Sequence, residues 1–313
     1  MTLFALIFAL VLEQARPLHD DNPAHAALRA WAAAARRWLD AGQWHHGWLA
    51  WALAVLGPVV LAVLIYGLLN WVHGLLGFAW AVLVLYLTLG FRQFSHHFTT
   101  IRVALESGDE AAARAELARW QGVEVAELPP QELLRHVIEH SVLAAHRHVF
   151  GVMVAFVAFA AIGLGPAGAV LYRMALHLAR HWPVRTTVQA EDASAAAARR
   201  GWHVVDYLPV RATALAFAVV GNFEEAIANW RQDGALNKGN DGLLLAASAG
   251  AMNVRLGSGP PLGEPLYTPE LGWSESDARV PQLAHLASMV GLVWRGVLLW
   301  LLLLALALFA RAW

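Results

Sequence analysis

Two ionisable side chains interrupt an apolar stretch in the second half of the chain. Asp206 and Arg211 lie five residues apart within the otherwise apolar run 204–220. Charged groups are costly inside a membrane segment, so they usually face a cavity or a charged partner and mark function. We therefore treat both as candidate catalytic residues. The alternative is an intramembrane ion pair that serves only packing.

A polar loop before a short helix rich in small residues has the composition of an anion site. Lys238, Asn240 and Gly242 lie in this loop, and the predicted helix 243–256 follows. The first turn of a helix presents free backbone N–H groups, which bind phosphate well when a lysine is near. Glycines before a helix are very common, so an ordinary helix start is the alternative interpretation.

A histidine motif offers a third kind of chemistry. His136, Glu139 and His140 match the H-x-x-E-H pattern of inverted zinc peptidases. A catalytic zinc site needs a third protein ligand at a suitable distance, and no obvious one follows. We therefore predict no metal site. Polar residues on the aqueous part of a helix are the simpler explanation, and Glu139 stays a candidate for its carboxylate alone.

Composition places these residues in a membrane protein. The 313-residue chain is 58% hydrophobic and 14% charged, whereas soluble domains are about 25% charged. A net charge of −1 gives no reason to expect nucleic acid. The absence of cysteine excludes disulfides, thiolate metal ligands and cysteine nucleophiles.

The elements that must position the candidate residues are therefore helices in and beside a bilayer. We predict an all-α fold, a polytopic integral membrane helical bundle with cytoplasmic helices and loops, formed by one domain over 1–313. Its predicted parts are a transmembrane hairpin (47–92), a cytoplasmic helical segment (93–148), a broken helical hairpin (149–182), the Arg211 helix with the Asn240 loop (203–257) and a C-terminal transmembrane helix (288–311). Whether residues 2–12 cross the bilayer is left open.

Two features decide the topology. Gly163, Gly165, Pro166 and Gly168 interrupt the apolar run 149–172, which favours a turn between two helices over a single span. The segments on either side of 47–90 are rich in arginine, and so is the segment after 172. The positive-inside rule places these segments in the cytoplasm, and a hairpin at 149–182 agrees with it.

Several motifs together resemble the CobD/CbiB family of membrane proteins of cobalamin biosynthesis. The run 250–257 (GAMNVRLG), which includes Arg255, resembles the family's AGALGVRLGG, and 239–242 (GNDG) is similar to its SPNAG. Further similarities are 208–213 (LPVRAT) to IPARLT, 221–226 (GNFEEA) to GNPE-A, 106–114 (ESGDEAAAR) to GDLEAARR, and 163–172 to GGAPGALLYR.

This resemblance implies an inner-membrane protein with its main loops in the cytoplasm, a lipid bilayer around it and a corrinoid substrate. Typical members are ATP-dependent ligases that join adenosylcobyric acid to aminopropanol or its phosphate, which implies ATP and magnesium. If the chain is such a ligase, its charge and placement predict that Arg211 binds the substrate carboxylate or its phosphorylated intermediate. Lys238, Asn240, Gly242 and Arg255 would bind substrate or phosphate, and Glu139 or Asp206 would place magnesium. No oligomeric state is predicted.

The chain also departs from the family pattern. Where the family has ESLAENTSDGVVAP, residues 139–152 read EHSVLAAHRHVFGV, and polar groups that a ligase would use are missing. The chain begins MTLF and has DYLPVR at 206–211, which resembles DWVPVR of the AmpE membrane proteins linked to β-lactamase induction. A catalytically degenerate family member and an AmpE-like, non-catalytic signalling protein are therefore the alternatives to an active ligase.

Overall fold

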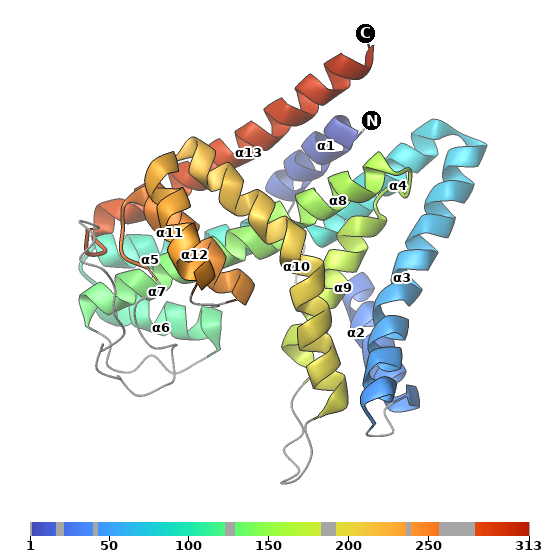
Figure 1. The fold of residues 1–313 in the computed structure, drawn as a ribbon, viewed down its shortest axis with the longest axis horizontal. Coiled ribbons are helices and arrows are strands. Elements are labelled where there is room, and N and C mark those ends of the chain that lie inside the picture. The colour runs from blue at the N-terminus through green and yellow to red at the C-terminus, as the bar shows by residue number, and fades with distance from the viewer. Residues whose placement is uncertain are drawn as a thin grey trace. The chain divides into compact units, whose positions relative to one another are not determined.

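The computed structural model describes residues 2–16, 22–39, 43–122, 129–182, 192–235, 239–256 and 279–312. These residues are helical nearly throughout (Figure 1), and an isolated β-bridge joins Val254 to Arg279. Within them, four helices are long and apolar enough to cross a bilayer: Trp44–Val72, Pro130–Ala161, Ala193–Val220 and Leu283–Ala310. The predicted all-α, polytopic membrane bundle is confirmed.

The chain divides into two compact units. Unit 1 comprises Met1–Phe91 and Arg147–Pro209, and unit 2 comprises Arg92–His146 and Val210–Trp313. Each point at which the chain passes from one unit to the other coincides with an interruption of regular α-helix. These interruptions are the break at 89–90, the π-helix η1 (His146–Phe150) and a proline inside a helix, Pro209. Each removes or shifts backbone hydrogen bonds of the α-helical pattern.

Unit 1 is built from helices of very different lengths. They are α1 (Thr2–Ala15), α2 (Pro23–Leu39), α3 (Trp44–Val72), α4 (Gly74–Thr88), α8 (Gly151–Ala161), α9 (Ala167–His181) and the first part of α10 (Ala193–Val220). Helices α3 and α4 pack against each other as a hairpin whose turn is His73. The His73 N–H donates to Leu69 O, and its imidazole accepts from the N–H of Leu75. One residue thus completes the end of one helix and the start of the next.

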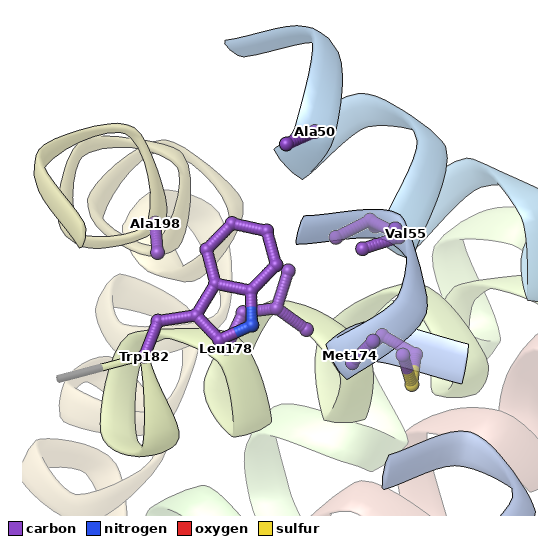
Figure 2. Close-up of a cluster of buried hydrophobic side chains, with 9 residues drawn as sticks. Ala50, Val55, Met174, Leu178, Trp182 and Ala198 are labelled. Atoms are coloured by element: carbon purple, nitrogen blue, oxygen red, sulfur yellow. The ribbon is translucent and has the colours of Figure 1, made fainter. Parts of the chain in front are cut away.

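The core of unit 1 lies where α2, α3, α9 and α10 meet (Figure 2). Alanines on α2, α3 and α10 let the helices approach closely, and the Trp182 ring fills the space between them. The Arg36 guanidinium lies over this ring, 5.6 Å from its centroid, and pairs with Asp192 at 2.5 Å. The Arg36 guanidinium thus lies at the edge of this apolar core, where it contacts both an aromatic ring and a carboxylate.

The predicted break in the apolar run at 163–168 is a tight turn between α8 and α9. Gly163 and Gly165 have positive φ angles of 83° and 57°, which glycine adopts without steric cost. Gly168 has a different task, because a Cβ there would lie 2.0 Å from the backbone oxygen of Ala155. Glycine at this position lets α9 pack directly on α8.

Unit 2 is built around a helix that is buried on nearly all sides. Its helices are α5 (Phe91–Glu106), α6 (Glu110–Gln121), α7 (Pro130–Ala145), the second part of α10, α11 (Phe223–Ala235), α12 (Gly239–Met252) and α13 (Leu283–Ala312). Helix α12 contacts α7, α11 and α13. Its contact with α11 is close at Gly250, where a Cβ would lie 2.4 Å from the Glu225 backbone oxygen.

Helix α7 lies in the segment that the sequence assigned to the aqueous phase. It continues through η1 into α8, and the combined helix Pro130–Ala161 is one of the four candidate spans. Its polar residues lie mainly in the first turns of α7, and a second polar group, His146, Arg147 and His148 of η1, precedes the apolar α8. The polar end of this helix carries the candidate site of unit 2.

Candidate functional site

Arg135 organises the polar end of α7. It is almost fully buried, and its Nη1 donates to both carboxylate oxygens of Glu139, at 2.8 and 3.0 Å. Its Nε donates to Glu132 at 2.8 Å. These partners lie one helical turn away on either side, the spacing at which helical side chains meet. Glu139, a predicted catalytic residue, is therefore held in an ion pair on its own helix.

The zinc-peptidase motif on the same helix does not form a metal centre. His136 Nδ1 lies 3.8 Å from Glu139, and the Arg135 guanidinium lies against the His136 ring, with 3.1 Å between Nη2 and Nε2. A bound cation beside this guanidinium would be repelled. Among the described residues, no three histidine, aspartate or glutamate side chains gather as metal ligands do. His136 and Glu139 are thus not arranged to share a zinc ion.

A second polar group of unit 2 pairs a histidine of α5 with a carboxylate of α6. His97 Nδ1 lies 2.8 Å from Glu116 Oε1, and the other oxygen of Glu116 lies 2.6 Å from Arg119 Nη1. The Glu116 side chain is 8% exposed, whereas that of His97 is 35% exposed. A buried carboxylate thus holds an imidazole whose other edge is open.

Aromatic contacts fix the same imidazole from the side. The His97 ring stacks on Trp120 of α6, with centroids 5.6 Å apart and planes 17° from parallel. The Trp120 ring meets His140 of α7 edge-on, at 4.3 Å between centroids. His97, Trp120 and His140 therefore form a continuous row of rings across three helices of unit 2.

Sequence reasoning did not find His97 or Glu116. A signal for their helices existed, because Gly108, at φ 78°, forms the turn and Asp109 caps α6 by accepting from the N–H of Ala112. That signal predicts two helices joined by a short turn over 91–121. It does not predict which side chains meet across the turn, since 19 residues separate His97 from Glu116.

Asp206 lies in unit 1 and is fully buried. It accepts a hydrogen bond of 2.9 Å from the hydroxyl of Tyr172, and Trp202 packs edge-on against the Tyr172 ring. The glycine at position 151 makes room for this tyrosine, because a Cβ there would lie 2.1 Å from its hydroxyl. A hydrogen bond to Tyr172 thus holds this carboxylate inside unit 1.

The other described candidates belong to unit 2. Arg211 is half-buried on α10, two residues after Pro209, and Thr213 on the same helix bonds the buried His146 at 2.9 Å. Asn240 and Gly242 lie in the first turn of α12, with Asn240 buried. Lys238 lies outside the described residues.

Arg255 follows the end of α12 and is exposed. The chain there is fixed by two backbone hydrogen bonds, from Arg255 N–H to Arg279 O at 3.0 Å and from Arg279 N–H to Asn253 O at 3.3 Å. Asn253 adopts the left-handed conformation, with φ 53°, in which helices commonly end. The described part of the GAMNVRLG motif therefore forms the end of α12 and the residues after it. Backbone hydrogen bonds hold these residues against the segment before α13.

Comparison with known proteins identifies the family. Residues 2–272 match the family model described as CobD/Cbib protein. The chain is 32% identical over 277 residues to Cobalamin biosynthesis protein CobD of Stutzerimonas stutzeri, covering 87% of this chain and 84% of that protein.

Two further relatives carry the same name. The protein of Chromobacterium violaceum is 31% identical over 257 residues (80% of this chain, 79% of the relative), and that of Leptospira interrogans is 26% identical over 233 residues (71% and 70%). No solved structure matches the chain. These matches give no support to the AmpE alternative. The predicted family is confirmed: this chain, a membrane protein, belongs to the CobD/CbiB family.

Proposed function

We propose that this chain is an inner-membrane ligase that joins adenosylcobyric acid to aminopropanol or its phosphate, at the expense of ATP. The match to the CobD/Cbib family over residues 2–272 carries this proposal. In this chemistry a corrinoid carboxylate attacks the terminal phosphorus of ATP and becomes an acyl phosphate, while the bond from this phosphorus to ADP breaks and ADP leaves. The amine then displaces phosphate, so that a C–N bond forms as a C–O bond breaks.

The polar residues of unit 2 supply groups for both steps. Arg211 is proposed to bind the corrinoid carboxylate and then its acyl phosphate, because a guanidinium offers paired donors to either group. Asn240 and Gly242, with Lys238 before them, are proposed to hold phosphate at the start of α12, because the first turn of a helix directs backbone N–H groups towards an anion. Arg255 is proposed to contribute positive charge to substrate binding.

Two of the predicted carboxylates, Glu139 and Asp206, are proposed to hold other side chains in position. Glu139 keeps the Arg135 cation in place, and Asp206 anchors Tyr172 between α9 and α10. Magnesium enters with ATP as the nucleotide complex, and no step is assigned to a metal ion held by the protein. The proposed orientation places the aqueous segments in the cytoplasm, where ATP is available.

Complementation tests the proposal in cells. The chain is expressed in a strain that lacks its own cobalamin ligase and is supplied with cobyric acid. Growth that depends on cobalamin is expected. Failure to grow, with the protein present in the membrane fraction at normal abundance, would count against ligase activity and in favour of a degenerate family member.

A direct assay tests the residue roles. Membranes containing the chain are incubated with adenosylcobyric acid, ATP, magnesium and aminopropanol, and the amide product is measured by mass spectrometry. Arg211→Gln is expected to lower the rate about 100-fold, since a charged hydrogen-bond partner contributes about 1.5–3 kcal/mol. The matched control is Arg200→Gln, an exposed arginine on the same helix, which should retain the rate. Equal rates for both variants would remove Arg211 from the site.

A further inference from the structure

The His97–Glu116 pair is the most highly organised polar group of unit 2 that the proposed function leaves without a part. A histidine with one nitrogen on a buried carboxylate and one edge open has the arrangement of a general base. The same pair could also serve only to join α5 to α6. The two possibilities differ in what the free nitrogen of the ring does.

Hydrogen bonding settles which nitrogen of His97 is available. Glu116 accepts from Arg119 at one oxygen and faces His97 Nδ1 with the other, at 2.8 Å. A carboxylate has no proton to donate, so Nδ1 carries the ring proton and donates it to Glu116. Nε2 of the neutral ring then holds the lone pair. Among the described residues, Nε2 has no hydrogen-bond partner.

Packing keeps the ring in this orientation. Trp120 covers one side of it, at 5.6 Å between centroids, and His140 in turn holds Trp120 edge-on. A ring fixed by both a hydrogen bond and a stacking partner loses little further freedom when a ligand binds. The 35% exposure of the side chain leaves its open edge accessible to a small solute.

The reaction contains one proton transfer that needs such a group. A primary amine has a pKa near 10, as lysine does, so aminopropanol reaches the protein as an ammonium ion at pH 7. An ammonium nitrogen has no lone pair and cannot attack an acyl phosphate. A base must first take one of its protons, and a second proton leaves nitrogen as the C–N bond forms.

We propose that His97 is the catalytic residue that takes the first proton from the ammonium group of the amine substrate, with Glu116 as its positioning residue. This role rests on the proposed ligase function. Nε2 accepts the proton, the free amine attacks the acyl carbon, and the C–O bond to phosphate breaks. The second proton from nitrogen goes to the departing phosphate, and His97 releases the first to water.

The test compares two nucleophiles in the membrane assay. Aminopropanol is protonated at pH 7, whereas hydroxylamine is largely unprotonated there and converts an acyl phosphate to a hydroxamate without a base. His97→Gln is expected to lower amide formation at pH 7 by about 100-fold, at the lower end of general-base effects. The same variant should form hydroxamate at the wild-type rate, because carboxylate activation does not involve His97.

The pH dependence gives a second, independent result. In His97→Gln the rate of amide formation should rise about tenfold per pH unit from 7 to 9, as the free amine becomes more abundant. Glu116→Ala should show an intermediate loss with normal hydroxamate formation. His96→Gln, an exposed histidine next to His97, is the matched control and should behave as wild type in both assays.

Each outcome decides a different point. Normal amide formation by His97→Gln would overturn the role of His97 and leave the ligase proposal intact. Loss of hydroxamate together with amide would show that the substitution damages the whole site, which also overturns the role as a base. If the wild-type chain forms neither product, the proposed function itself fails, and the role of His97 fails with it.

Discussion

Substituting Gly168 by alanine tests how closely α8 and α9 approach. A Cβ at this position would lie 2.0 Å from the backbone oxygen of Ala155 and 2.9 Å from the ring of Phe159. Real Cβ atoms essentially never come within 3.0 Å of a neighbour, so the helix pair must open by at least about 1 Å. A backbone oxygen cannot turn aside as the end of a side chain can.

The cost follows from the lost contact. A gap of about 1 Å forfeits up to half of the dispersion energy of the atoms that line it. Overpacking of this kind typically costs 1–3 kcal/mol, and the backbone clash places Gly168→Ala at about 2–3 kcal/mol. Taking the value for domains of 150–250 residues, about 2–4 °C per kcal/mol, the expected loss in unfolding temperature is about 4–12 °C.

The assay is thermal unfolding of the detergent-purified protein, followed by tryptophan fluorescence or by loss of the monodisperse peak on size-exclusion chromatography. Gly67→Ala on α3 is the matched control, since a Cβ there meets no atom within 4 Å. Alanine is also the better helix former, by about 1 kcal/mol. The control should therefore be neutral or slightly stabilising. An unfolding temperature for Gly168→Ala equal to that of Gly67→Ala would refute the close packing of α8 on α9.

Three further predictions concern other polar contacts. Asp192→Asn should lower the free energy of unfolding by about 1–3 kcal/mol, because it leaves the largely buried Arg36 without its carboxylate, and a double-mutant cycle with Arg36→Gln should show coupling between the two sites. Thr213→Val should cost about 1 kcal/mol, since it removes the hydroxyl bonded to the buried His146, whereas Thr213→Ser should retain the bond; unfolding temperatures of both variants measure this. His177 lies on α9, which is not among the candidate spans. Its pKa is lowered from 6.5 to about 4, first by burial and then by the nearby charges of His181, Arg173, Arg29 and His25. The unfolded chain therefore binds this proton more tightly, so stability should fall as pH drops from 6.5 towards 4, and in His177→Gln the unfolding temperature should depend less on pH over this range.

The membrane setting and the fold class could be predicted from sequence because they depend on local properties. Hydropathy along a run of about 20 residues decides whether a helix can cross a bilayer, and no partner is needed to evaluate it. The turn near 163–168 was predictable for a similar reason, since glycine and proline limit the backbone wherever they occur. The family was also recognisable, because its motifs are short contiguous runs such as 250–257.

The candidate site was less predictable, because its character depends on which side chains meet. The sequence marks Asp206 as an ionisable residue in an apolar run, but its partner, Tyr172, comes from a helix 34 residues earlier. Glu139 was predicted as a candidate catalytic residue that could place magnesium, and in the structure it forms an ion pair with the buried Arg135.

The His97–Glu116 pair shows most clearly what only the tertiary structure decided. Each residue alone is an ordinary polar residue on an amphipathic helix. Their pairing depends on the turn at Gly108 and on the packing of α6 against α7, which together bury Glu116 and leave His97 open. Local sequence therefore determined that this chain is a helical membrane protein. Packing between distant segments determined which of the described polar groups meet, as His97 meets Glu116.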